Sequence, residues 1–287
     1  MNGLVYHIVS GQAFFTGVAL LVLAAFASTC SRPIFTRITV LSFLIGVIAV
    51  VVSSTAIPYW CYGVASLAMM VWIASALKTK CRRPAAIAMG GICLILALIE
   101  LPYHLTHSLS PAKSRTMTVI GDSVTAGVDG DETSETWPSL FARQHQIQVQ
   151  DISHIGETAA SALKRAKIQT IESSVVIVEI GGNDILGSTT TAEFASDLEA
   201  LLAYLEMPER QVIMFEMPLP PFCHEFGRIQ RTVAARHKAK LIPKRVFLSV
   251  IAGNESTLDT IHLSQSGHQF MADAVWQNTK AAYVKEP

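Results

Sequence analysis

Acidic residues are missing from the first third of this 287-residue chain. No Asp or Glu precedes Glu100, and only six of the 22 basic residues do, namely Arg32, Arg37, Lys78, Lys80, Arg82 and Arg83. The rest of the chain therefore holds 16 basic residues against all 22 acidic ones, a formal charge of −6. Since phosphate binding needs a basic face, this balance argues against nucleic acid as a partner.

Cysteine is also scarce. The five cysteines are Cys30, Cys61, Cys81, Cys93 and Cys223. Only Cys223 lies in the polar part of the chain, which excludes a disulfide within that part. No spacing between them matches a zinc site or a CxxC redox pair. We therefore expect small buried or lipid-facing side chains here, with no metal site.

Long apolar runs fill the region that lacks acidic residues. Four stretches approach the roughly 20 residues that a helix needs to cross about 30 Å of hydrocarbon: Gln12–Ser28, Ile38–Ile57, Tyr59–Leu77 and Pro84–Leu101. A water-soluble helical bundle would need a polar stripe that these stretches lack. Nothing basic precedes the first stretch, so it is not a typical signal peptide. The sequence predicts an all-α transmembrane region of four spans at residues 1–103, in contact with membrane lipid.

The basic residues predict the orientation of these spans. Arg32 and Arg37 follow the first stretch, and the cluster from Lys78 to Arg83 follows the third. Because basic loops stay in the cytoplasm, both of these loops are expected inside. The N-terminus and everything after Leu101 are then expected on the periplasmic or extracellular side of the cytoplasmic membrane.

A linker at residues 104–115 separates this region from a domain at 116–287, in which strand and helix patterns alternate. The expected strands are Met117–Gly121, Ile147–Ile152, Val175–Ile180, Gln211–Phe215 and Lys240–Ile242. The expected helices are Trp137–Gln144, Thr158–Ile168, Thr191–Leu205, Phe226–His237 and Ser266–Ala282. Such alternation predicts an α/β fold with a parallel sheet of about five strands and helices on both faces. Ligands of these folds bind outside the carboxyl ends of the strands.

The first strand ends in Gly121-Asp122-Ser123. Glycine permits a sharp turn, and the serine then begins a helix, where the helix dipole favours developing negative charge. Alternatively, Asp122 or Ser123 only caps that helix.

Two other strand ends offer donors to a developing oxyanion. The third strand ends in Gly181-Gly182-Asn183-Asp184, and the amide of Asn183 is a suitable donor. Gly156 follows the second strand and can present its backbone N–H to the same point. For Asp184 we favour a capping role at the next helix.

Asp259-Thr-Ile-His262 follows the last strand, at the same sheet edge as Ser123. Three residues of separation on a turn let the carboxylate hold one imidazole nitrogen while the other faces the serine. His154 is a competing base, but no acid stands beside it to orient the ring.

Taken together and in this order, the four blocks resemble the GDSL, or SGNH, hydrolase family over about residues 115–281. Ser123, Gly156, Asn183 and His262 match the four residues of the family's name, and Asp259 matches its triad acid. The resemblance is greatest to the compact periplasmic thioesterase, lysophospholipase and arylesterase branch. It implies a three-layer α/β/α, flavodoxin-like fold and no metal or cofactor. It also implies an oxyanion hole made by the N–H groups of Ser123 and Gly156 and the side chain of Asn183.

The resulting hypothesis is a membrane-anchored serine ester hydrolase with Ser123 as nucleophile and Asp259 and His262 as its partners. Its substrate is an acyl ester or thioester, such as a lipid or an acetylated glycan of the cell envelope. Two alternatives remain: an O-acyltransferase that uses the same triad, and a catalytically silent membrane-anchored binding module. The sequence does not distinguish hydrolase from transferase, and it does not define the oligomeric state.

Overall fold

The computed structural model describes residues 1–76, 79–127, 135–220, 222–253, 255–259 and 261–284. It contains two compact units. The first unit consists of Leu105–Pro218 and Glu225–Pro287, together with Met1. The second consists of Asn2–His104 and Leu219–His224. The predicted division of the chain at residues 103 and 116 stays a prediction.

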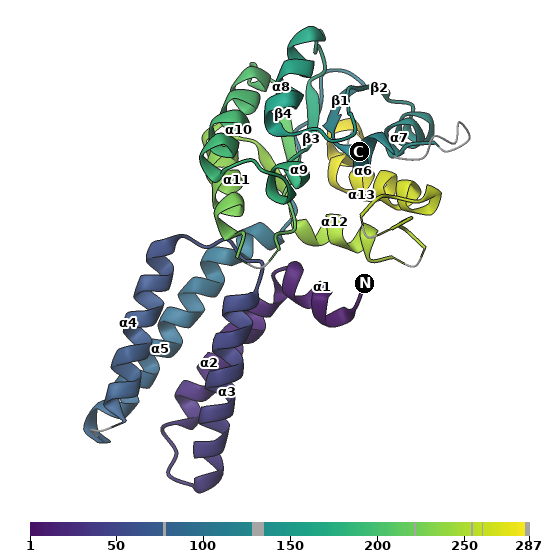
Figure 1. Cartoon of the computed structure of the whole chain (residues 1–287). Helices are drawn as coiled ribbons and strands as arrows, with labels where there is room; N and C mark the ends of the chain where they lie inside the picture. Colours follow the sequence, from purple (N-terminus) through teal and green to yellow (C-terminus); the bar gives the residue numbers. More distant parts are fainter. Residues whose placement is uncertain (77–78, 128–134, 221, 254, 260, 285–287) are drawn as a thin grey trace. The chain divides into compact units, whose positions relative to one another are not determined.

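A five-stranded parallel sheet forms the centre of the first unit (Figure 1). The strands are β1 (Thr116–Gly121), β2 (Gln148–Asp151), β3 (Val175–Glu179), β4 (Gln211–Phe215) and β5 (Lys240–Ile242), in the spatial order β2-β1-β3-β4-β5. Gly121 at the end of β1 pairs in register with Glu179 at the end of β3. The carboxyl ends of the two central strands therefore lie together, and the loops that follow them begin side by side.

Helices cover both faces of this sheet (Figure 1). On one face lie α7 (Trp137–His145), α12 (Lys244–Ile251) and α13 (Gln265–Tyr283), and on the other α8 (Ala159–Ile168), α10 (Thr191–Leu205) and α11 (His224–Arg236). The strands β3 and β4 are apolar along almost their whole length because both faces are buried, whereas the edge strand β2 is polar and partly exposed. Val119, Ile177 and Phe215 pack in one core cluster with Trp137 and Phe247.

This architecture confirms the predicted three-layer α/β fold. Each predicted strand lies within one residue of the observed one at either end, and each predicted helix within two residues. Helix α12 was not predicted. It follows Pro243 directly after the three-residue strand β5 and has only eight residues, although its buried Lys244, Phe247 and Leu248 have the i, i+3, i+4 spacing of an amphipathic helix.

The second unit is helical and contains α1 (Gly3–Val9), α2 (Gln12–Ala27), α3 (Pro33–Val52), α4 (Tyr59–Ser75), α5 (Thr79–Glu100) and the short 3-10 helix η1 (Leu101–His104). Helix α2 packs against α3 and α5, and α4 packs against α5. Gly17 and Gly46 let α2 and α3 approach closely, since a Cβ on Gly17 would lie only 2.7 Å from the Gly46 carbonyl oxygen.

Two helices of this unit, Pro33–Val52 and the helical stretch Cys81–His104, are long and apolar enough to cross a membrane. A third is added if α1 and α2, which meet at an 85° bend, count as one span, and α4 is apolar but shorter. Three predicted boundaries were wrong, including the start of the fourth span at Pro84, since helix α5 begins at Thr79. The predicted span Ile38–Ile57 begins five residues earlier, because Pro33 starts the helix, and the helix ends at Val52. Helix α2 begins at Gln12, where the first span was predicted to begin, and α1 before it is a separate helix, since Gly11 has a φ of 83°.

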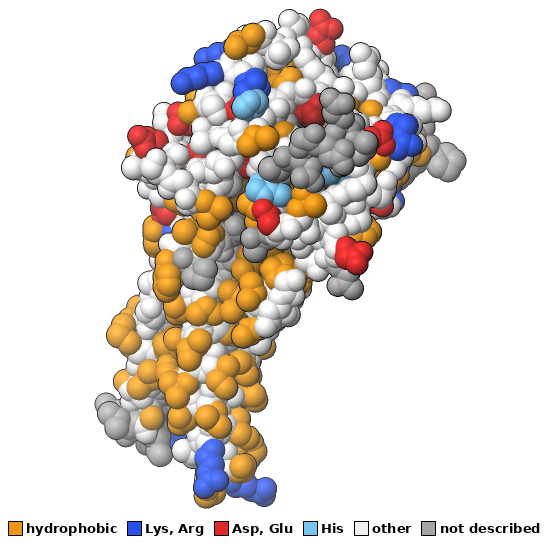
Figure 2. All heavy atoms as spheres, turned by 45° about the vertical axis from the view of Figure 1, so that its right-hand side comes forward, with side chains coloured by type: hydrophobic (Ala, Val, Ile, Leu, Met, Phe, Trp, Pro, Cys, Tyr) orange, Lys and Arg blue, Asp and Glu red, His pale blue; other side chains and the backbone are white. Residues whose placement is uncertain are grey.

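The surface of the helical unit is mainly hydrophobic on the face that Figure 2 shows, and Lys and Arg side chains gather at its tip. The α2–α3 connection and the start of α5 lie at the same end of the bundle (Figure 1). These are the two places where the sequence puts Arg32, Arg37, Arg82 and Arg83. Leu77 and Lys78, which end the third predicted span and begin the basic cluster, lie outside the described residues.

One short segment from late in the chain belongs to the helical unit. Leu219–His224 follows β4 by three residues and is fixed by hydrogen bonds to the turn after α3. The backbone N–H of Leu219 donates to Ser54 Oγ at 3.0 Å, and His224 Nε2 lies 2.7 Å from the carbonyl oxygen of Ser53.

Candidate active site

Ser123 is the first residue of the short helix α6 (Ser123–Ala126), directly after β1. Asp122 caps this helix, because its side chain accepts a hydrogen bond from the Val124 N–H at 2.9 Å. The turn requires glycine before it, since a Cβ on Gly121 would lie 2.4 Å from Thr125 Oγ1. Ser123 is therefore not needed as the cap, and its hydroxyl is left for another partner.

That partner is His262. Its Nε2 lies 3.1 Å from Ser123 Oγ, and its Nδ1 lies 2.6 Å from Asp259 Oδ2. The other carboxylate oxygen of Asp259 accepts the backbone N–H groups of Ile261 and His262 at 2.8 and 2.9 Å. The structure thus brings the three predicted triad residues into one hydrogen-bonded chain.

The hydrogen bonds that Asp259 accepts keep its carboxyl group ionised. The bond from the His262 side chain, followed by those from the two backbone N–H groups, holds the pKa of Asp259 well below its usual range. An ionised Asp259 accepts the Nδ1 proton of a neutral His262, and Nε2 is then an acceptor for the Ser123 hydroxyl. This is the arrangement that a serine nucleophile and its general base require.

One predicted oxyanion donor, the amide of Asn183, is hydrogen-bonded to the residue that precedes Ser123. Asn183 is in the short helix α9 (Gly182–Leu186), which follows β3. Its Nδ2 donates to the carbonyl oxygen of Glu157 at 2.9 Å and to Asp122 Oδ2 at 3.2 Å. Glu157 follows Gly156, and Asp122 precedes Ser123, so the amide of Asn183 connects the immediate neighbours of the other two predicted donors. Gly156 has a φ of 75°, a backbone conformation that favours glycine.

A buried pair of acids supports this arrangement, and the sequence reasoning missed it. Glu179 Oε2 accepts a hydrogen bond from Thr125 Oγ1 at 2.9 Å and one from the Asp122 N–H at 3.3 Å. Burial, reinforced by the neighbouring charge of Asp122, raises the pKa of Glu179 well above its usual range. Burial also raises the pKa of Asp122. Two buried carboxyls in contact hold one proton between them, so Glu179 is the neutral partner.

Helix α7 completes the support of the serine turn. The indole Nε1 of Trp137 donates to Thr125 Oγ1 at 3.1 Å, and Thr125 in turn donates to Glu179. The backbone N–H of Trp137 donates to His268 Nδ1 at 3.2 Å. Burial lowers the pKa of His268, which keeps that nitrogen an acceptor. A glutamate at the end of an otherwise apolar strand was the one sequence signal for this network.

The remaining candidates lie elsewhere. The ring of His154 is exposed, and its Nδ1 lies 2.8 Å from the Ile155 carbonyl oxygen. Asp184 was expected to cap the next helix, which was wrong: its Oδ2 accepts the backbone N–H of Ala159, at the start of the preceding helix α8. Within the described ranges, no three His, Cys, Asp or Glu side chains form a group that could hold a metal ion.

Comparison with known proteins gives consistent results. The model of the GDSL-like Lipase/Acylhydrolase family matches residues 119–270, just over half of the chain. Esterase TesA of Pseudomonas aeruginosa is 27% identical over 209 residues, which cover 68% of this chain and 98% of that protein. The arylesterase of Vibrio mimicus is 24% identical over 197 residues, which cover 64% of this chain and 97% of that protein. The crystal structure of TesA matches with a TM-score of 0.50 and 26% identity, and covers 57% of this chain and 97% of that one.

Proposed function

Because the chain belongs to the GDSL-like lipase/acylhydrolase family, we propose that it is a membrane-anchored serine ester hydrolase acting outside the cytoplasmic membrane. Carboxylic ester hydrolysis is the chemistry of the family and of the matched esterases. The proposal assigns Ser123 as nucleophile, His262 as general base and Asp259 as the acid that orients His262. The observation that carries it is the chain of hydrogen bonds from Asp259 through His262 to Ser123 Oγ, at 2.6 and 3.1 Å.

Catalysis proceeds in two acyl-transfer steps. His262 Nε2 takes the proton of Ser123 as Oγ attacks the carbonyl carbon of an ester or thioester. The resulting imidazolium, which Asp259 stabilises, gives this proton to the leaving alcohol or thiol, and an acyl group remains on Ser123. Water then attacks the acyl-enzyme, with His262 again as base, and releases the carboxylic acid.

The oxyanion formed in each step is held by the N–H groups of Ser123 and Gly156 and by the amide of Asn183. Both protons of that amide already donate within the protein, to Glu157 and Asp122. The Asp122 acceptor is the more distant of the two, at 3.2 Å. An oxyanion would therefore replace Asp122 as the partner of that proton, while the bond to Glu157 keeps the side chain in place.

Membrane insertion of the helical unit is the second part of the proposal. Helices α3 and α5 have 20 and 22 residues, or about 30 and 33 Å, and match the hydrocarbon thickness. Helices α2 and α4 have 16 and 17 residues, about 24 and 26 Å, and pack against the longer pair, which makes four spans. The basic end of the bundle is then cytoplasmic, and the hydrolase domain is outside. A protease added to sealed right-side-out vesicles should digest residues 105–287, and protection of this region would contradict the orientation.

An anchored enzyme at this surface has esters of membrane lipids and acetylated glycans within its reach. The test uses the full chain, purified in detergent, with p-nitrophenyl butyrate as substrate. Ser123→Ala should lower kcat by at least about 10³-fold and abolish labelling by a fluorophosphonate. Ser249→Ala, at an exposed serine of α12, is the matched control and should leave both unchanged. Turnover by Ser123→Ala at the wild-type rate would overturn the assignment of the nucleophile.

A second measurement tests which molecule, water or another hydroxyl compound, takes the acyl group from Ser123. Hydrolysis predicts release of free acid at a rate unchanged by added glycan or glycerol acceptors. Transfer of the acyl group to such an acceptor, at the expense of free acid, would make the chain an acyltransferase with the same triad. A profile of acyl chain lengths then separates short acetyl esters from long lipid acyl groups.

A further inference from the structure

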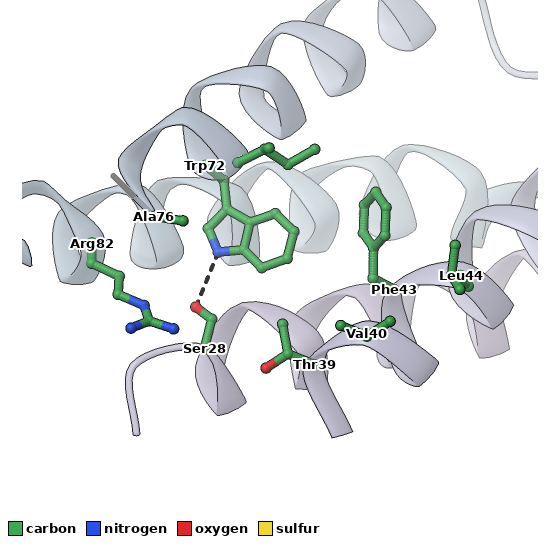
Figure 3. Close-up of a pocket in the computed structure, with 9 residues that line it drawn as sticks. Ser28, Thr39, Val40, Phe43, Leu44, Trp72, Ala76 and Arg82 are labelled. Carbon is green, nitrogen blue, oxygen red and sulfur yellow. Dashed lines mark hydrogen bonds between the residues drawn. The ribbon is translucent and has the colours of Figure 1, made fainter. Parts of the chain in front are cut away.

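The basic end of the helical unit contains a hollow of about 220 Å³ (Figure 3). It lies between the end of α2, the first half of α3, the end of α4 and the first turn of α5. Its wall is mostly apolar and includes Val40, Phe43, Leu44, Trp72 and Ile73. The indole of Trp72 is fixed in this wall, because its Nε1 donates to Ser28 Oγ at 3.1 Å.

Among the residues that the structure describes, Arg82 is the charged one that lines the hollow (Figure 3). Its Nε is buried and has no hydrogen-bond partner among the residues that the structure describes. A buried donor without an acceptor is costly, and more so in a charged group. Ser28, which also lines the hollow, donates to the Ala25 carbonyl oxygen and accepts from Trp72 Nε1.

The helical unit has no counter-ion for this guanidinium. Glu100 is the only acidic residue in its sequence, 18 residues or about 27 Å further along α5. Glu100 is buried and paired with His104 at 3.4 Å. Arg82 also stands in the first turn of α5, which contains no acidic residue and where the helix dipole disfavours a cation. An anion from outside the protein would accept a hydrogen bond from Arg82 Nε, neutralise the guanidinium and interact favourably with the start of α5.

We propose that this hollow binds an anionic phospholipid, with one acyl chain against Val40, Phe43 and Trp72 and the headgroup phosphate on Arg82. Guanidinium is the side chain best suited to a phosphate, since it presents several donors in a planar fork. An apolar wall that leads away from a cation matches an amphiphile better than a free phosphate. Basic pockets between apolar helices on the cytoplasmic side have the chemistry for anionic headgroups. The site rests on the proposed membrane insertion, but not on the catalytic assignment.

The test is native mass spectrometry of the full chain in detergent, with phosphatidylglycerol and phosphatidylcholine of identical acyl chains. Wild type should retain phosphatidylglycerol in preference to phosphatidylcholine. Arg82→Gln should lower this retention about fivefold, Arg82→Lys less, and Arg83→Gln, at an exposed neighbour, not at all. Val40→Trp should also lower it, because the indole fills the hollow without changing any charge. Glycerol phosphate, the headgroup fragment alone, should not compete.

Three results would overturn the proposal. Equal losses in Arg82→Gln and Arg83→Gln would show diffuse attraction to a basic surface, and unchanged retention in Val40→Trp would show that no acyl chain enters the hollow. Competition by glycerol phosphate would assign the site to a free phosphate instead. Carbonate extraction of whole membranes distinguishes failure of the lipid site from failure of membrane insertion. A chain that is not inserted would be released into the soluble fraction, whereas an inserted chain without the lipid site would stay in the membrane. Ester hydrolysis should be unchanged in all four variants.

Discussion

Replacement of Asp259 by asparagine tests the orientation of His262, the proposed general base. In the native chain Oδ1 of Asp259 accepts two backbone N–H groups, and Oδ2 accepts the Nδ1 proton of His262. The asparagine carbonyl oxygen should keep the two backbone bonds, which forces its NH₂ group toward Nδ1. His262 must then accept at Nδ1 and carry its proton on Nε2, where it points at Ser123 Oγ. In this tautomer the ring does not remove the serine proton.

The expected loss follows from this geometry. An amide flipped to favour the native tautomer would give up both backbone bonds, so the inactive tautomer should dominate. The change should lower kcat by about 10³–10⁴-fold, the scale of the same change in the serine protease triad. Asp259→Ala should lose about tenfold less. Its side chain imposes no tautomer, and water can accept the Nδ1 proton because the native carboxylate is 53% exposed.

The assay is steady-state hydrolysis of p-nitrophenyl butyrate by the full chain in detergent, with the rate of fluorophosphonate labelling as an independent measure of serine reactivity. Both should fall in parallel, while KM changes little. The reasoning is refuted if the asparagine variant keeps more than a tenth of wild-type kcat. It is also refuted if the alanine variant is the slower of the two, since steric loss and not tautomer selection would then explain the effect.

Three further changes probe the groups around the serine. Asn183→Ala removes one oxyanion donor and should lower kcat about a hundredfold or more at similar KM, measured by steady-state kinetics; a loss below tenfold would exclude this role. Glu179→Gln keeps a neutral side chain that can donate to Asp122, so kcat should stay within about threefold of wild type, whereas Glu179→Ala should lose at least tenfold because Thr125 and the Asp122 N–H lose their acceptor. Equal losses would show that the proton on Glu179 is unimportant. The pKa of His268 is lowered by burial, so the unfolded chain binds the proton more readily: stability should be full above about pH 6.5 and fall as the pH drops below it, and thermal midpoints of His268→Asn should fall less. Thermal midpoints of wild type and His268→Asn that fall equally with pH would contradict this role of His268.

The sequence predicted the sheet and the positions of the candidate site well, for a local reason. The strands β3 and β4 are short apolar runs, and Ser123 and Asn183 closely follow strand ends, whereas Asp259 and His262 come after β5 with helix α12 in between. In a parallel sheet those ends share one edge, so chain order was enough to expect Ser123, Asn183 and His262 near each other. The structure shows the hydrogen bond that joins His262 to Ser123 and the one that joins Asn183 to Asp122, while their catalytic roles stay a proposal.

Features that depend on distant contacts were not predicted. Glu179 reads as one polar residue at the end of an apolar strand, and only the register of β1 and β3 shows that it meets Asp122 and Thr125. The end of α3 was misplaced for a similar reason. Hydropathy continues to Ile57, but the backbone leaves the helix at Ser53, where Ser53 and Ser54 bond to residues about 170 positions later. Hydropathy measures solvent preference along the chain and contains no information on such partners.

The hexapeptide Leu219–His224 has a practical consequence for dissecting this protein. Its Leu219 N–H donates to Ser54 Oγ, and its His224 side chain is hydrogen-bonded to the Ser53 carbonyl oxygen. A soluble fragment that starts at residue 105 would keep the hexapeptide and lose both serines. Cutting the chain at residue 105 therefore does not separate the two compact units cleanly, and the turnover of such a fragment should not be taken as that of the full chain.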